Sequence, residues 1–131
     1  MTRYVVDASA VLAILAEPIE IAPEHELLAP TLLRSEVLSR LHAAAGRGDV
    51  PADVALERLE RIGRMGIRYL GDGVLRRLAW KIADEQGWTE TGEAEYLALT
   101  RLQAKALVTA DDAVARRATG IVPVASLDDL R

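Results

Sequence analysis

The sequence predicts one α/β domain with three layers, α/β/α, in which a mainly parallel sheet is covered by helices on both faces. Short apolar runs rich in strand-forming residues alternate along the chain with longer segments whose apolar residues recur at helical spacing. Such alternation is typical of parallel α/β sheets. The 131 residues suffice for one core, and no repeat or linker divides them, so we expect residues 1–131 to form a single domain.

The first half of the chain predicts three strands and three helices. The strands are expected at Arg3–Val6, Glu26–Ala29 and Ile67–Leu70. The helices are expected at Ser9–Ala16, in TLLRSEVLSRLHAAAGRG after Pro30, and from Pro51 through Ile62. Apolar residues are too dense in the first helix for a surface position, so it should be mostly buried. Glycines follow the second and third helices and mark their ends.

The second half repeats the alternation. Helices are expected from Val74 to about Gln86, from Gly92 to about Gln103, and at Asp112–Ala118. Strands are expected at Lys105–Ala110 (KALVTA) and in the last apolar run, IVPVA.

Composition limits the classes of function. The chain has no cysteine, which excludes disulfides, thiolate zinc sites and a cysteine nucleophile, and its two histidines lack the spacing of a metal pair. It contains no apolar run of membrane-spanning length and no signal-peptide pattern, so we expect a cytoplasmic protein without a membrane partner. The formal net charge of -4 means that nucleic-acid binding would need local basic patches.

Four acidic residues are candidates for function, although each has a simpler explanation. Asp7 and Asp111 fall where a predicted strand hands over to a helix, the edge at which open α/β sheets bind ligands, but aspartate is also a preferred helix cap. Glu36 lies within a helix and could form an ion pair with Arg40. Glu93 lies in the first turn of a helix, where its charge complements the helix dipole.

Together the four acids carry more weight than any one of them. If they converge above the sheet edge, their charges repel one another unless a cation neutralises them, and carboxylate oxygens suit Mg²⁺ or Mn²⁺. Such an ion could activate water and polarise a phosphate. Ser9 and Thr109 place hydroxyl groups two residues from the aspartates, where they could fix those carboxylates.

Four segments carry a resemblance that covers nearly the whole chain. They are VVDASAVLAIL, LLAPTLLRSEVLSRL, GEAEYLALTRLQAKALVTADDAVAR and IVPVA. In these motifs, and in the order and spacing of its acids, the sequence resembles the PIN-domain ribonucleases, above all the VapC toxins of bacterial toxin-antitoxin modules. The resemblance implies a PIN-like fold, RNA phosphodiester hydrolysis with Mg²⁺ or Mn²⁺, a homodimer, and a VapB-like antitoxin as partner.

The resemblance assigns residues by position. Asp7, Glu36 and Asp111 match three acids of the family, while Glu93 stands where the family usually has aspartate. All four are therefore predicted catalytic and metal-binding residues. Glu95 is a second candidate for the third acid, and Asp112 could be an additional ligand or a helix cap.

Two other readings remain open. The first is a binding module of the same fold with a degenerate acid set, which Glu93 motivates because the family usually has aspartate there. The second is an aspartyl-phosphate receiver or phosphatase. It is disfavoured because no acid stands two residues after Asp7 and no lysine follows Asp111. No RNA-binding residue is assigned. The basic groups in 58–68 and 76–81 are typical of solvated helices, and Tyr96 is interpreted as a core residue.

Overall fold

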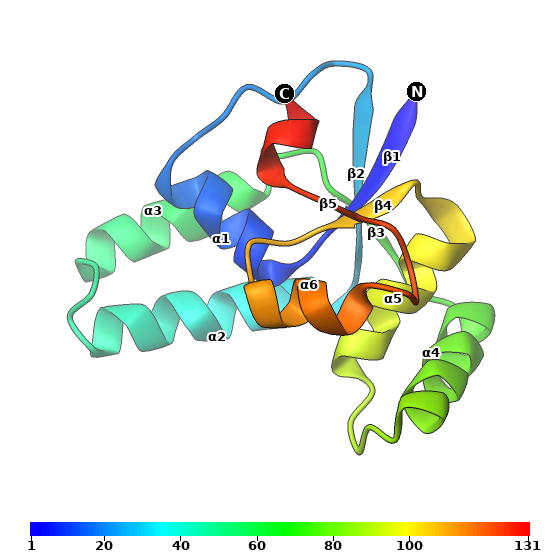
Figure 1. Ribbon diagram of the computed structural model, residues 1–131. Helices are drawn as coiled ribbons and strands as arrows, with labels where there is room; N and C mark the ends of the chain where they lie inside the picture. The colour runs from blue at the N-terminus through cyan, green and yellow to red at the C-terminus, as the bar shows by residue number, and fades with distance from the viewer.

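The fold is built on one five-stranded parallel sheet. A computed structural model describes all residues, 1–131, and orders the strands β3-β2-β1-β4-β5 (Figure 1). Every neighbouring pair is parallel. The strands are β1 (Thr2–Val6), β2 (His25–Pro30), β3 (Arg68–Leu70), β4 (Ala106–Val108) and β5 (Val124–Ala125).

Six helices surround this sheet, and a short 3₁₀ helix ends the chain. They are α1 (Ala8–Ala16), α2 (Leu32–Gly46), α3 (Ala52–Ile62), α4 (Gly73–Gln86), α5 (Gly92–Gln103), α6 (Asp112–Ala118) and the 3₁₀ helix η1 (Leu127–Leu130). Figure 1 shows α1, α2 and α3 on one side of the sheet and α4 and α5 on the other. Helix α5 packs directly on β1, β2 and β4, and α4 packs on α5. The predicted three-layer α/β/α fold is confirmed.

The central strands owe their position to their apolar sequence. Val5 and Val6 of β1 and Leu107 and Val108 of β4 are fully buried, as expected for strands covered on both faces. Helix α5 is buried along most of its length, including Leu97. Strands β1 and β4 therefore lie at the centre of the core, and the residues that follow them are held on a rigid support.

Most predicted element boundaries agree with the structure to within two residues, but β4 and β5 are shorter than expected. Strand β4 ends at Val108, beyond which the Ala110 N–H donates to the Ser9 hydroxyl instead of to a strand carbonyl and the Thr109 hydroxyl donates to Asp7. Strand β5 begins only at Val124, since Pro123 has no N–H to donate and the preceding residues form a turn after α6. The η1 helix was not predicted. None of the helices combines the length and the apolar character needed to cross a bilayer.

Candidate active site

Two of the predicted acids lie together because β1 and β4 are neighbours. Val6 pairs with Val108 in parallel register, so Asp7 and Thr109 leave the sheet side by side at its carboxyl edge. Asp111 follows two residues later, at the start of α6. This edge is where α/β sheets bind ligands, and the structure confirms the predicted placement of both aspartates there.

Asp7 is buried and accepts three hydrogen bonds. Its Oδ1 accepts from the Ser9 hydroxyl at 2.7 Å and from the Ala10 N–H at 2.9 Å, and its Oδ2 accepts from the Thr109 hydroxyl at 2.5 Å. The two hydroxyls in turn accept from the backbone N–H groups of Ala110 and Asp111, so their own protons point to Asp7. Asp7 is therefore both the cap of α1 and a carboxylate locked in one orientation.

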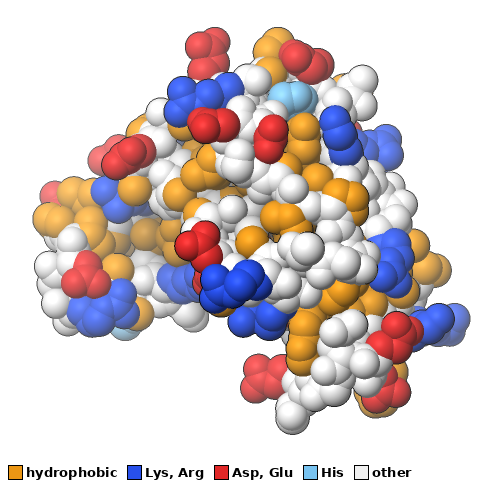
Figure 2. Space-filling view, in the orientation of Figure 1, with side chains coloured by type: hydrophobic (Ala, Val, Ile, Leu, Met, Phe, Trp, Pro, Cys, Tyr) orange, Lys and Arg blue, Asp and Glu red, His pale blue; other side chains and the backbone are white.

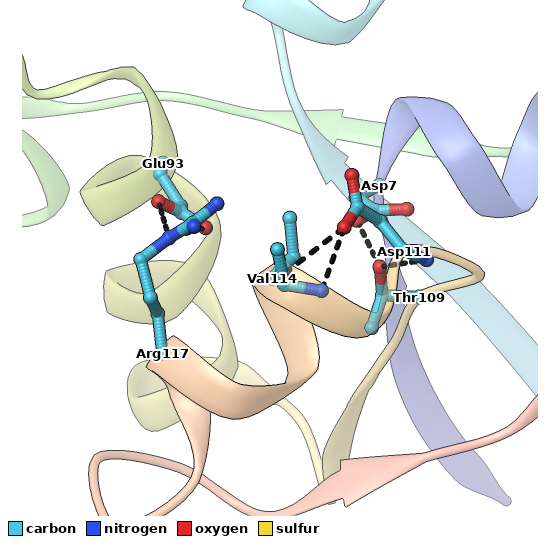
Figure 3. A network of polar contacts seen from close by, with 7 residues as sticks. Asp7, Glu93, Thr109, Asp111, Val114 and Arg117 are labelled. Atoms are coloured by element: carbon cyan, nitrogen blue, oxygen red, sulfur yellow. Dashed lines mark hydrogen bonds and ion pairs between the residues drawn. The ribbon is translucent and has the colours of Figure 1, made fainter.

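Asp111 combines a capping role with an open side. Its Oδ1 accepts from the N–H groups of Ala113 and Val114, at 2.8 and 3.2 Å, as Figure 3 shows for Val114. The hydrogen bond from Val114, followed by that from Ala113, lowers the pKa of Asp111. Its Oδ2 accepts no hydrogen bond from the chain, so one oxygen of an ionised carboxylate remains available to a ligand.

Glu36 is held by a residue from another helix. The Tyr96 hydroxyl on α5 donates to its Oε1 at 2.5 Å, while the ion pair with Arg40 that the helical spacing allowed is not formed. Burial, followed by the hydrogen bond to Glu36, raises the pKa of Tyr96, so the phenol stays protonated and remains a donor. Only 5% of Tyr96 is exposed. The interpretation of Tyr96 as a core residue is confirmed, and its hydroxyl also bonds to Glu36.

Glu93 forms an ion pair across the site. Arg117 of α6 donates from Nε to both Glu93 carboxylate oxygens, at 3.1 and 2.9 Å, and Figure 3 shows Val114 between this pair and the two aspartates. The hydrogen bond to Glu93 raises the pKa of Arg117. Thr91, which precedes the first turn of α5, makes no capping hydrogen bond. Arg117 is thus a site residue that sequence reasoning missed.

One pocket of about 580 Å³ joins these residues. Its lining includes all four predicted acids, Asp7, Glu36, Glu93 and Asp111. The α4–α5 connection supplies another wall through residues 87–90, where Gly87 has the positive φ of 71° that ends α4. The further polar and charged side chains of the lining are Arg40, Thr89, Glu90, Tyr96 and Arg117.

The two additional candidates do not line this pocket. Glu95 lies outside its lining, and burial, followed by repulsion from Glu36, raises the pKa of Glu95 while Arg76 opposes the shift. Asp112 is an exposed residue in the first turn of α6. Of the two candidates for the third acid, Glu93 lines the pocket and Glu95 does not.

The donor chemistry of the pocket fits a hard divalent cation, since five carboxylates line it, those of the four predicted acids and that of Glu90. The carboxylates do not converge on one point, however, because no three acidic or histidine side chains lie close enough to hold one ion. Glu36 and Glu93 are instead turned to Tyr96 and Arg117. The structure thus brings the predicted set to one pocket without forming a coordination shell.

Solved structures of other proteins share the fold of this chain. The chain is similar to PAE2754 from Pyrobaculum aerophilum, with 25% identity and a TM-score of 0.74 over 98% of this chain and 93% of that one. It is also similar to a chain of VapBC-1 from nontypeable Haemophilus influenzae, with 13% identity and a TM-score of 0.64 over 97% and 99% of the two chains.

A third solved structure has the same fold. It is VapBC2 from Rickettsia felis bound to a DNA fragment from their promoter, with 8% identity and a TM-score of 0.64 over 95% of this chain and 98% of that one. No protein-family model and no curated protein matches the chain. Likeness of this kind, over nearly the full length, shows a shared fold.

Proposed function

From the VapC-type PIN-domain fold of the chain, we propose that this protein is a divalent-metal-dependent endoribonuclease, the toxin of a toxin-antitoxin pair. One observation carries the proposal: four acids far apart in the sequence line one pocket at the carboxyl edge of the parallel sheet. Mg²⁺ or Mn²⁺ bound there supplies an activated water and offsets charge on the phosphate oxygens. The products would carry a 3′-hydroxyl and a 5′-phosphate.

Each of the four acids has a role in holding the proposed ion. Asp7, Glu36 and Asp111 would hold the ion, with Asp7 fixed by two hydroxyl donors and Asp111 offering its unbonded Oδ2. Glu93 completes the set at the side of the pocket where it also holds Arg117. The aspartates already have their orientation, whereas the two glutamates are bonded to Tyr96 and Arg117 and would have to turn toward the ion.

The direct test is cleavage of RNA by the purified protein with Mg²⁺ or Mn²⁺, with excess chelator, and in the Asp7→Asn variant. Asparagine caps a helix as well as aspartate does, so this variant should fold. We expect metal-dependent cleavage that is lost in the variant and on chelation. Equal cleavage by the variant would reveal a contaminating nuclease and contradict the proposal.

A second candidate function is a binding module of the same fold with a degenerate acid set. Glu93 supports it, because its carboxylate is paired with Arg117. Calorimetric titration with Mn²⁺ separates the two. Binding that disappears in Asp7→Asn supports the nuclease, and no binding up to millimolar concentrations favours the module.

The partners follow from the same fold. We propose a VapB-like antitoxin as partner, as the names of two of the similar structures suggest. A homodimer is proposed from the resemblance of the sequence to the VapC toxins. Expression of the chain in a bacterium should arrest growth, and co-expression of the small neighbouring gene should relieve the arrest. Growth arrest by Asp7→Asn as strong as that by the wild-type chain would contradict a nuclease toxin.

A further inference from the structure

A pocket lined by carboxylates needs fixed positive charge to accept a phosphodiester. Two arginines line this pocket, Arg40 from α2 and Arg117 from α6. The face of the molecule in Figure 2 has no continuous basic surface, since blue and red side chains alternate across it and blue ones lie over α6. Long-range attraction is also absent, because the net charge is -4. Apart from a bound cation, the positive charge of the pocket therefore comes from these two guanidinium groups.

Arg117 is held in a way that leaves its outer donors available. Only its Nε bonds to Glu93, and neither Nη group makes a hydrogen bond within the chain. A guanidinium has five N–H donors in one plane, so anchoring at Nε leaves a fork of Nη donors in a defined direction. Such a fork matches the two non-bridging oxygens of a phosphate. The side chain is 46% exposed, which leaves it accessible to a ligand.

Arg40 has a complementary position. It lies one helical turn after Glu36 on α2, and its side chain makes no hydrogen bond or ion pair with the chain. Its charge acts on both Tyr96 and Asp111, which line the same pocket. An arginine without a carboxylate partner beside an acidic site is free to bind an anion.

The geometry points to Arg40 and Arg117 as the residues that bind the phosphate groups of a single-stranded RNA, with Glu93 as the positioning residue for Arg117. This inference rests on the proposed function, because RNA is the proposed substrate. The ion pair then has a function: in the metal-free protein, Glu93 holds Arg117 by its Nε and leaves the Nη fork free for a phosphate. Phosphate contacts of this kind give affinity without sequence specificity.

The test measures RNA binding without cleavage. The probe is a fluorescein-labelled single-stranded RNA in excess EDTA. Its binding to the protein is measured by fluorescence anisotropy at several KCl concentrations, and its integrity is checked on a gel. Arg40→Gln and Arg117→Gln should each weaken binding about tenfold and make the salt dependence shallower by nearly one phosphate contact. Arg116→Gln is the matched control, because Arg116 is an exposed neighbour on α6 that does not line the pocket, and it should change affinity less than about twofold.

Two results would overturn the inference: affinities of the two variants equal to that of Arg116→Gln, or no saturable binding by the wild-type protein in the micromolar range. Circular dichroism confirms that each variant is folded. The outcome is independent of the nuclease test. RNA binding that depends on the arginines, without any cleavage, would refute the nuclease proposal and support the phosphate-binding role of the arginines. Metal-dependent cleavage with unchanged RNA binding in Arg117→Gln would support the nuclease proposal and refute that role.

Glu93→Gln tests the positioning role separately. Removal of one negative charge from the pocket should by itself tighten RNA binding, whereas loss of the ion pair should release the Arg117 fork and weaken it. We expect weaker binding in EDTA, with little further loss when Arg117→Gln is added. Tighter binding by Glu93→Gln would contradict the positioning role.

Discussion

The two sides of the pocket are built differently. On the sheet side, Asp7 is buried and fixed by Ser9, Thr109 and the first turn of α1. On the helix side, Glu93 and Arg117 form an ion pair whose side chains are 28% and 46% exposed. Buried hydrogen bonds cost free energy when one partner is lost, whereas exposed ion pairs contribute little. The sheet side should therefore be rigid and important for stability, and the helix side adaptable.

This difference suggests a division of roles. A carboxylate with a fixed orientation is suited to begin a metal site, because its position costs no further ordering when the ion arrives. An ion pair near the surface can adjust to a substrate. The following variants test that comparison, from the largest expected effect to the smallest.

The largest effect is expected at Asp7. Asp7→Ala removes the cap of α1 and leaves the hydroxyls of buried Thr109 and half-buried Ser9 without their acceptor, so the free energy of unfolding should fall by about 2–3 kcal/mol. Glu93→Ala, the matched change on the helix side, should cost less than about 1 kcal/mol. Urea unfolding measures both values. An equal loss in the two variants would refute the contrast between the two sides.

Thr109 tests the support of Asp7 alone. Thr109→Val keeps the shape of the side chain but removes the donor to Asp7 and the acceptor for the Asp111 N–H, and should cost about 1–2 kcal/mol. Divalent metal affinity should also fall, by about tenfold, because Asp7 loses its orientation. Thr91→Val is the control, since Thr91 is exposed and does not cap α5. Unchanged Mn²⁺ affinity in Thr109→Val would show that this support is only structural.

Tyr96 tests the contact between α5 and α2. Tyr96→Phe removes the hydroxyl that orients Glu36 and should cost about 1 kcal/mol. Tyr69→Phe is the matched control, because the Tyr69 hydroxyl makes no hydrogen bond while its ring contacts Arg34. Mn²⁺ affinity, measured by calorimetry, should change in the first variant only. A change of equal size in both would mean that the Glu36 contact does not matter for the ion.

The smallest effect concerns Glu95. Burial and repulsion from Glu36 raise the pKa of Glu95 in the folded state, so the folded protein binds this proton more tightly than the unfolded chain. The free energy of unfolding should therefore fall as the pH rises through that raised pKa.

Glu95→Gln should remove this pH dependence. It should stabilise the protein at pH 7 relative to wild type by less than about 1 kcal/mol, and by nothing below about pH 4. Glu60→Gln, at an exposed position of α3 without an ion pair, is the control for urea unfolding at the two pH values. A loss of stability at pH 7 in Glu95→Gln would be the opposite of the expected sign.

The fold could be predicted from the sequence because its signals are local. Hydrophobic periodicity located all five strands and six helices, and Asp7 and Asp111 stood out because they follow buried strands. Strand ends were the weak point, as β4 showed: after Val108 the chain makes hydrogen bonds to Asp7 and Ser9, which follow another strand, β1.

The site was only partly predictable. Glu36 and Arg40 are four residues apart on one helix, and that local spacing suggested an ion pair that Tyr96 replaces from α5. Tyr96 itself lies three residues after Glu93, which is a signal that the two share a helix face. No comparable signal pointed to Arg117, because its contact with Glu93 depends on how α6 packs beside α5.

The central claim is that Asp7, Glu36, Glu93 and Asp111 together hold a divalent cation. Its most direct test is anomalous diffraction from crystals of the protein soaked in millimolar Mn²⁺. We predict a peak in the pocket within about 2.0–2.4 Å of oxygens of Asp7, Glu36 and Asp111, with Glu93 turned toward it. No peak in the pocket, or one bound only elsewhere on the surface, would contradict the account.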